Sequence, residues 1–378
     1  MKKIQLLAMF ALSFALFSCK AKTIDTTGKI KLVSSIFPQY DWAQNIAGPT
    51  NDKIIPKLIV KNGVDVHSFQ PSANDIVNIC SADILIYNGG ESESWIKDAL
   101  KNATNKNMIV INLSECAKDF LKEEQIVEGM QEEEHEHEIA SASPRNDGGD
   151  LPSNDGGDLP RNDGGASHDD DEVALHNYDE VDLHDDDEHD EHHHHDDEIE
   201  FDEHIWFSID VVKVAVNEIT NALCTLDNEN IEVYEQRKQT YISKLNLLDT
   251  KYKNALSNAS KDTIIVCDRF PFAYLTDAYD INYYAAFLGC SAETEASFET
   301  ITFLSNKIDE LDTNNVIILE SSKDKLAKTI IHSTKNHKLA DIHVLDSMQS
   351  TTLAQIMNGK TYIGVMEENL ETLKKVLN

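Results

Sequence analysis

Residues 227–259 read DNENIEVYEQRKQTYISKLNLLDTKYKNALSNA, and the segment has a helical pattern throughout. Its apolar residues recur mostly three or four positions apart, as on one face of a helix, and they are Ile231, Tyr234, Tyr241, Ile242, Leu245, Leu248, Tyr252 and Leu256. A continuous helix of about 30 residues is about 45 Å long, which is more than one small α/β lobe requires. The segment therefore predicts a long backbone helix that joins two folded lobes.

The part of the chain before this helix has alternating strand and helix patterns. Strands are predicted at residues 30–36, 54–60, 84–87 and 108–112, with helices between them. Ser72 is placed to cap one of these helices, with Asp75 at its third position. Such alternation is typical of a parallel sheet that helices cover on both faces.

A second set of the same kind follows the long helix. Strands are predicted at residues 263–266, 316–319 and 343–345, and a final helix at residues 361–377. The predicted fold class is α/β, with two Rossmann-like α/β lobes joined by one long backbone helix. The first lobe takes residues 30–122 and 204–226, the helix takes 227–259, and the second lobe takes 260–378.

Residues 123–203 interrupt the first lobe with a very different composition. They contain 32 Asp or Glu, 10 His and only two Arg, so their net charge is −30 and the other 297 residues carry −4. Neither lobe has the basic patch that nucleic-acid binding requires. The segment has too few large apolar side chains to offset the entropy of ordering, so we expect a disordered loop inserted in the first lobe.

This loop is also rich in imidazole and carboxylate groups, which are ligands of divalent transition metals. The repeated unit Asn-Asp-Gly-Gly-Asp-Leu-Pro indicates a flexible spacer before the His-rich part. We expect accessory metal binding at the histidines of the loop, namely His135, His137, His184, His189, His192, His193, His194 and His195.

Residues 1–19 have the pattern of a signal segment. Lys2 and Lys3 precede an apolar run that is too short to span a bilayer permanently. The run ends in Leu16-Phe17-Ser18-Cys19, which resembles a bacterial lipobox with Cys19 as the lipidation site. We therefore expect an extracytoplasmic protein that a lipid on Cys19 anchors to the membrane, with a linker at residues 20–29. A plain cleaved signal is the alternative, because Phe17 is bulkier than the lipobox pattern usually shows.

Two histidines in predicted loops stand in distinctive local sequences. His67 lies in Gly63-Val-Asp-Val-His-Ser-Phe-Gln-Pro-Ser72, and His204 lies in Asp202-Glu-His-Ile-Trp206 directly after the acidic loop. These motifs, with a His-rich loop in that place, resemble those of the substrate-binding lipoproteins of bacterial zinc and manganese ABC importers. The resemblance covers essentially the whole mature chain. It implies two α/β lobes bridged by a rigid helix, with a metal ion in the cleft.

The resemblance also implies a ligand set, in which His67 and His204 come from the first lobe. Zinc-type members have a third His after the first strand of the second lobe, but residues 266–272 here read Val-Cys-Asp-Arg-Phe-Pro-Phe. The implied replacement is Glu295, and Asp346 after the last strand is the implied fourth ligand. Each has a structural alternative, because Glu295 can cap the helix that begins near Phe298 and Asp346 can cap the following turn.

Other residues near these positions remain alternatives. Asp268 and Arg269 are expected to form an internal ion pair, since Arg is a poor metal ligand and a good carboxylate partner. Asp268 and Glu293 are reserve ligands. Cys290 can supply a soft zinc ligand, although a buried thiol is the expectation.

Two imidazoles and two carboxylates can hold zinc or manganese, and bare affinity favours zinc. The His-rich loop also favours zinc. The resemblance implies a monomeric, non-enzymatic zinc receptor that delivers the ion to the permease and ATPase of an ABC importer. The alternatives are a manganese receptor of the same family and a surface adhesin or metal buffer. A zinc hydrolase is disfavoured because the sequence has no HExxH and no Gly-x-Ser-x-Gly motif.

Overall fold

The computed structural model describes residues 28–49, 51–131, 201–291, 295–335 and 339–378. The described residues form one compact unit, to which all described helices and strands belong. The predicted signal segment with Cys19 and the eight loop histidines lie outside the described residues.

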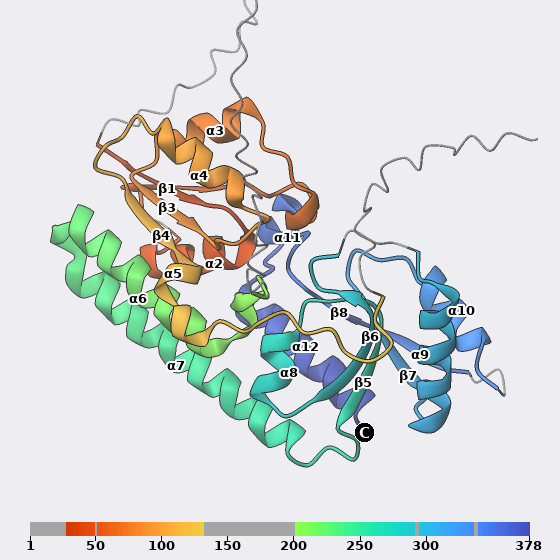
Figure 1. Ribbon diagram of the computed structural model, residues 1–378. Helices are drawn as coiled ribbons and strands as arrows, with labels where there is room; N and C mark the ends of the chain where they lie inside the picture. Colours follow the sequence, from red (N-terminus) through yellow and green to blue (C-terminus); the bar gives the residue numbers. More distant parts are fainter. Residues whose placement is uncertain (1–27, 50, 132–200, 292–294, 336–338) are drawn as a thin grey trace, which may run out of the picture. The chain divides into compact units, whose positions relative to one another are not determined.

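Four parallel strands form the sheet of the first lobe, in the spatial order β2-β1-β3-β4 (Figure 1). They are β1 (Ile30–Ser34), β2 (Ile54–Leu58), β3 (Ile84–Tyr87) and β4 (Ile109–Asn112). The helices of this lobe are α2 (Phe37–Ala47), α3 (Ala73–Cys80), α4 (Ser94–Lys101) and α5 (Leu113–Cys116). Short 3-10 turns are η2 (Val66–Ser68) and η3 (Lys118–Phe120). The predicted cap of α3 is confirmed, since Ser72 and Asp75 each accept a hydrogen bond from the other's backbone N–H.

The second lobe repeats this arrangement, with a parallel sheet of order β6-β5-β7-β8. Its strands are β5 (Thr263–Phe270), β6 (Asn282–Leu288), β7 (Asn315–Leu319) and β8 (Asp341–Leu345). Its helices are α8 (Ala273–Ala278), α9 (Phe298–Glu310), α10 (Lys325–His332), α11 (Leu353–Met357) and α12 (Tyr362–Val376). The prediction of two similar α/β lobes is confirmed. Strand β6 was not predicted, because its apolar run fits a buried helix as well as a strand.

Successive side chains of the strands point to opposite faces of each sheet and enter different hydrophobic cores. In β1, Leu32 belongs to the core that contains α6 and α7 residues, while Val33 packs with residues of α3 and α4. In β5, Ile264 faces the same large core as Leu32, and Ile265 packs under α9 and α10. The two sheets therefore share one continuous core on their inner faces, and separate helix pairs cover their outer faces (Figure 1).

The predicted long helix is α7 (Ile231–Leu256), a helix of 26 residues that packs beside α6 (Ile209–Leu226). The 3-10 turn η5 (Asn228–Asn230) connects them, and η4 (Ile205–Phe207) precedes α6. Tyr241 of α7 donates a hydrogen bond to the Asp41 carboxylate in α2, and Tyr252 donates one to the Met366 carbonyl in α12. The middle and the C-terminal part of the helix are thus bonded to different lobes, which opposes a wide hinge movement between them.

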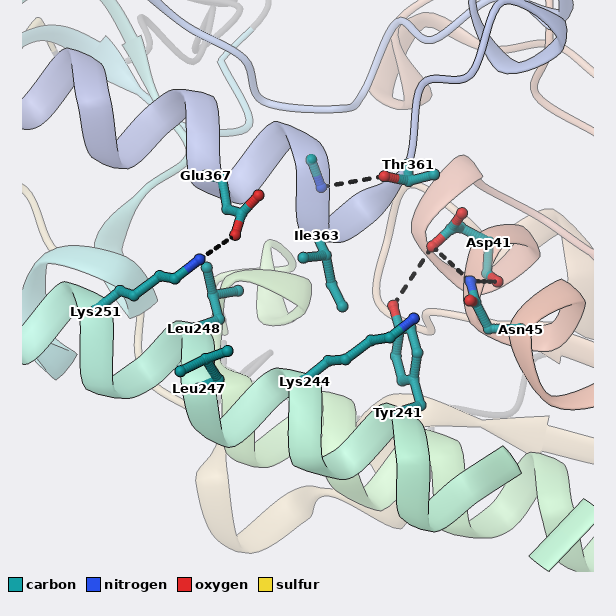
Figure 2. Close-up of a pocket in the computed structure, with 11 residues that line it drawn as sticks. Asp41, Asn45, Tyr241, Lys244, Leu247, Leu248, Lys251, Thr361, Ile363 and Glu367 are labelled. Carbon is teal, nitrogen blue, oxygen red and sulfur yellow. Dashed lines mark hydrogen bonds and ion pairs between the residues drawn. The ribbon is translucent and has the colours of Figure 1, made fainter. Parts of the chain in front are cut away.

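A cavity of about 340 Å³ lies where α2, α7 and α12 meet (Figure 2). Asp41 lies in its wall, and its carboxylate also accepts a hydrogen bond from Asn45 at 3.2 Å. Lys251 of α7 forms an ion pair with Glu367 of α12, with 2.6 Å between Nζ and Oε1. Burial raises the pKa of Asp41 to about 6, against the opposing hydrogen bonds from Tyr362 and Tyr241. Polar contacts therefore join both lobes to α7 at this junction.

The ends of the acidic segment are ordered, which corrects the prediction that residues 123–203 are disordered throughout. Glu123 pairs with Phe201 in an antiparallel bridge, and Gln131 pairs with Phe287 of β6. Met130 is buried in the large core. The high charge of the whole segment hid the short run at residues 125–130, whose apolar residues give residues 123–131 enough contacts to pack. The folded unit therefore includes residues 123–131 and 201–203.

Candidate metal centre

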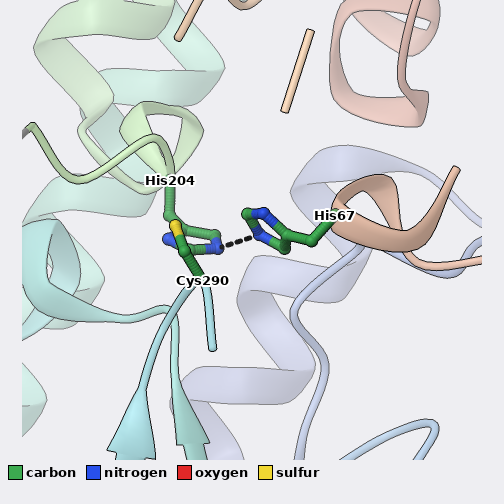
Figure 3. A group of neighbouring side chains, drawn as sticks. All are labelled: His67, His204 and Cys290. Carbon is green, nitrogen blue, oxygen red and sulfur yellow. Dashed lines mark hydrogen bonds between the residues drawn. The ribbon is translucent and has the colours of Figure 1, made fainter. Parts of the chain in front are cut away.

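The two histidines that the sequence singled out lie side by side, although 137 positions separate them. His67 is in η2 after strand β2, and His204 immediately precedes η4 (Figure 3). Their Nε2 atoms are 3.1 Å apart, and His204 is completely buried. The structure thus brings two imidazole nitrogens from distant segments to one point.

The ring of His67 is oriented by contacts with its other nitrogen and with its backbone. Nδ1 lies 2.6 Å from the Ser92 hydroxyl, and the backbone N–H of His67 donates a hydrogen bond to Asp65. Nε2 is consequently the nitrogen that faces His204. Burial and the neighbouring His204 ring lower the pKa of His67, so this ring is neutral near pH 7 and retains a lone pair for a metal.

The ring of His204 is held by the acidic residues that precede it. Nδ1 lies 2.7 Å from Asp202 Oδ1, which also accepts the backbone N–H of His204 at 2.7 Å. A carboxylate behind a histidine in this way is the usual support of a metal ligand. Burial alone would lower the pKa of His204, but the Asp202 carboxylate outweighs it and raises the pKa. Glu203 accepts a hydrogen bond from Ser92 N, so the motif also supports the His67 ring.

The thiol of Cys290 completes a group of three possible ligand atoms with the two imidazoles (Figure 3). All three atoms lie within 4.8 Å of one another. Cys290 comes just after β6, and the preceding Gly289 allows the close approach, because a Cβ there would lie 2.8 Å from Cε1 of His204. Recognising β6 in the sequence would have placed Cys290 at the carboxyl edge of the sheet, where ligands of parallel α/β sheets collect.

Asp346, the expected fourth ligand, is engaged elsewhere in the structure. Its Oδ2 lies 2.6 Å from Lys360 Nζ, and its Oδ1 accepts the backbone N–H of Met348. The second contact is the turn cap that the sequence offered as the alternative. Asp346 is therefore not among the residues that meet at the two histidines.

Glu295, the expected third ligand, is exposed and lines a cavity of about 680 Å³ with Asp268 and Arg269. It does not cap α9, because Ser297 has that role. Glu293 lies outside the described residues.

The expected ion pair between Asp268 and Arg269 is also wrong. Arg269 instead pairs with Asp65 across the lobes, with 2.7 Å between Nη2 and Oδ2. The Asp268 carboxylate accepts the backbone N–H groups of Arg269 and Leu319. Asp65 therefore contacts both the His67 backbone and the second lobe. The sequence did not reveal this partner of Arg269, because Asp65 is far from Arg269 along the chain.

Gln349 was not anticipated, yet its side chain reaches the centre of the site. Its amide nitrogen lies 2.8 Å from His67 Nε2 and 2.7 Å from His204 Nε2. It follows β8 in a loop in which Met348 has a positive φ of 64°. No local motif marks Gln349, because its place depends on the fold of that loop.

The comparisons with known proteins agree with this fold. Residues 32–376 match the model of the family described as zinc-uptake complex component A, periplasmic (ZnuA). The zinc-binding protein AdcA of Streptococcus pyogenes is 27% identical over 376 residues, which are 99% of this chain but 61% of that relative. The high-affinity zinc uptake system protein ZnuA of Bacillus subtilis is 24% identical over 360 residues, which are 95% of this chain and 91% of that relative.

A solved structure, the metal-dependent lipoprotein YcdH of Bacillus subtilis, shares the fold. Its TM-score is 0.63 at 22% identity, with coverage of 93% of this chain and all of the other. The chain spans only 61% of the AdcA relative's length. The match to the family model, in contrast, extends over nearly the whole chain. The chain belongs to the family of the periplasmic zinc-uptake complex component A.

Proposed function

We propose that this chain is an extracytoplasmic receptor that binds one zinc ion at His67, His204 and Cys290 and delivers it to an ABC importer. The observation that carries the proposal is the convergence of two imidazole nitrogens, 3.1 Å apart, with a thiol in the same group. Relatives named for zinc binding and high-affinity zinc uptake support the same metal.

The donor set favours zinc on chemical grounds. Two nitrogens at about 2.0–2.1 Å from a tetrahedral zinc ion are about 3.3 Å apart, which is close to the observed separation of the Nε2 atoms. Thiolate is a soft ligand that suits zinc, whereas manganese prefers oxygen donors. A site with Cys290 therefore disfavours the manganese reading. Glu295 and Asp346 form the carboxylate alternative, which requires both side chains to leave their present positions.

Delivery follows from the position of the centre between loops of both lobes. His67 and His204 come from the first lobe and Cys290 from the second, so a small shift of the Cys290 loop would open the coordination. We propose that the ion passes to a membrane permease with its ATPase, that the receptor acts as a monomer without catalysis, and that lipidated Cys19 anchors it to the membrane. Among the described residues, no helix combines the length and the apolarity needed to span a bilayer.

The test is competitive zinc titration of the full chain and of His67→Ala, His204→Ala and Cys290→Ser. Each change should weaken the tightest site by more than about 100-fold, which exceeds the loss typical of a supporting residue. Glu295→Gln and Asp346→Asn should leave the affinity within a few-fold, and His343→Ala, which contacts Asn315 away from the site, is the matched control.

Cobalt(II) in place of zinc identifies the donors directly, because a thiolate ligand gives an intense charge-transfer band. The wild type should show this band and Cys290→Ser should lose it. A wild-type spectrum without the band, together with lost affinity in Glu295→Gln and Asp346→Asn, would replace the proposed ligands with the carboxylate set.

A further inference from the structure

Gln349 occupies the point on which the two imidazoles converge. The residue is 3% exposed, and its amide nitrogen is within hydrogen-bond distance of Nε2 of both histidines. Because Nδ1 of His67 faces Ser92 and Nδ1 of His204 faces Asp202, the Nε2 atoms are the nitrogens that face each other and Gln349. The amide nitrogen carries two hydrogens, which it can donate to both Nε2 atoms when each ring has its one proton on Nδ1.

The other end of the same amide shows what this placement costs. Oε1 of Gln349 is buried and has no hydrogen-bond partner among the described residues. A buried carbonyl without a partner is unfavourable, since it has lost its hydration. The position of the side chain is therefore determined by the two histidines and not by its own carbonyl.

A zinc ion would need the same space. An ion about 2.0–2.1 Å from both Nε2 atoms, along the lone pairs that now accept hydrogen bonds, overlaps the amide nitrogen. We propose that Gln349 is an internal competitor of the metal: its amide must leave the ring nitrogens when the ion binds, and it returns to them as the ion departs. This inference rests on the proposed zinc site at His67 and His204.

Such a competitor suits a protein that must release what it binds. The returning amide satisfies both lone pairs at once, so the protein without the ion does not bury two unpartnered acceptors. The amide is neutral, so it adds no charge that would repel a cation. Gln349 would thus lower the affinity and speed release without changing the ligands.

The test compares the wild type with Gln349→Leu, which has a similar size and no donor, and with Gln349→Ala as a second variant. Ser350→Ala is the matched control, since the neighbouring Ser350 contacts Glu320 and not the histidines. Loss of the two hydrogen bonds should tighten zinc binding about tenfold. The gain should appear mainly as a slower release of zinc to a fluorescent chelator in stopped-flow mixing.

Two measurements without zinc test whether loss of the hydrogen bonds between Gln349 and the histidines causes the change in zinc binding. Both Gln349 variants should unfold at a lower temperature in the presence of a chelator, and the ¹⁵N signals of both Nε2 atoms should shift. Weaker zinc binding in both variants would overturn the proposal, because Oε1 of Gln349 would then be a ligand. Unchanged binding would overturn it as well. Unaltered zinc binding by His204→Ala would instead refute the underlying zinc site, and this inference with it.

Discussion

Asp65 and Arg269 show how a single ion pair connects the site to both lobes. Asp65 accepts the backbone N–H of His67 and pairs with Arg269, and both side chains are largely buried. Arg269 lies in the segment where the resemblance in the sequence implied a third histidine. The Arg269 guanidinium therefore contacts the first lobe in a segment where a metal ligand was expected.

Arg269→Ala should lower the free energy of unfolding by about 2 kcal/mol, because it leaves the Asp65 carboxylate without its charged partner. The number of zinc ions bound should not change. Urea denaturation and metal counting on the same samples check this, with Arg269→Lys as the variant that keeps the charge. Unchanged stability with loss of zinc would mean that Arg269 belongs to the metal site itself.

Individual residues also show what a sequence can predict. His67 and His204 were found because each lies in a local motif, and the Ser72 cap of α3 was found because its partner is three residues away. Gln349 and the partner of Arg269 were not found, since both depend on segments that meet only in the folded chain. Cys290 was underrated because the strand that positions it was not recognised.

At the level of elements, Asp41 lies where α2, α7 and α12 meet, and its carboxyl group makes the stability of the fold depend on pH. The pKa of Asp41 is raised to about 6 by burial, so the folded protein binds this proton more tightly than the unfolded chain. The proton is present in both states well below pH 4. Between about pH 4 and pH 6 the unfolded chain has lost this proton while the folded protein still holds it, so stability falls as the pH rises through this range and is then constant with respect to Asp41.

Asp41→Asn should remove this contribution, which is roughly 3 kcal/mol between about pH 4 and pH 7. Urea denaturation at both pH values gives the change in the free energy of unfolding from pH 4 to pH 7. This change should be more positive in Asp41→Asn than in the wild type. Tyr241→Phe, which removes a hydroxyl that contacts Asp41, should steepen the loss. An identical pH dependence of all three proteins would refute this account of the junction.

The helices and strands that were predicted correctly are those with a clear local sequence pattern. Strong periodicity revealed α7, and short apolar runs next to turns revealed β1 to β4. The run Tyr-Tyr-Ala-Ala-Phe-Leu of β6 was missed, because a continuous apolar run does not distinguish a strand from a buried helix. The ordered residues 123–131 were missed because a charge average over the whole segment outweighed a few apolar contacts.

For the whole molecule, two repeated α/β lobes share a core and are fixed to one helix, and the proposed metal centre lies where their loops meet. This arrangement keeps the lobes from moving far apart, so we expect metal exchange through loop movements near Cys290 and Gln349. The His-rich segment lies outside the described residues, and its accessory role in collecting metal remains a prediction.

The most direct test of the central claim is a metal count on a protein in which a short Gly-Ser linker replaces residues 132–200. Zinc and a large excess of manganese would compete during dialysis, and the bound metal would be measured per chain. We predict one tightly bound zinc ion that manganese does not displace, because the described residues supply the ligands. Loss of tight binding with the segment, or retention of manganese in place of zinc, would contradict a zinc site at His67, His204 and Cys290.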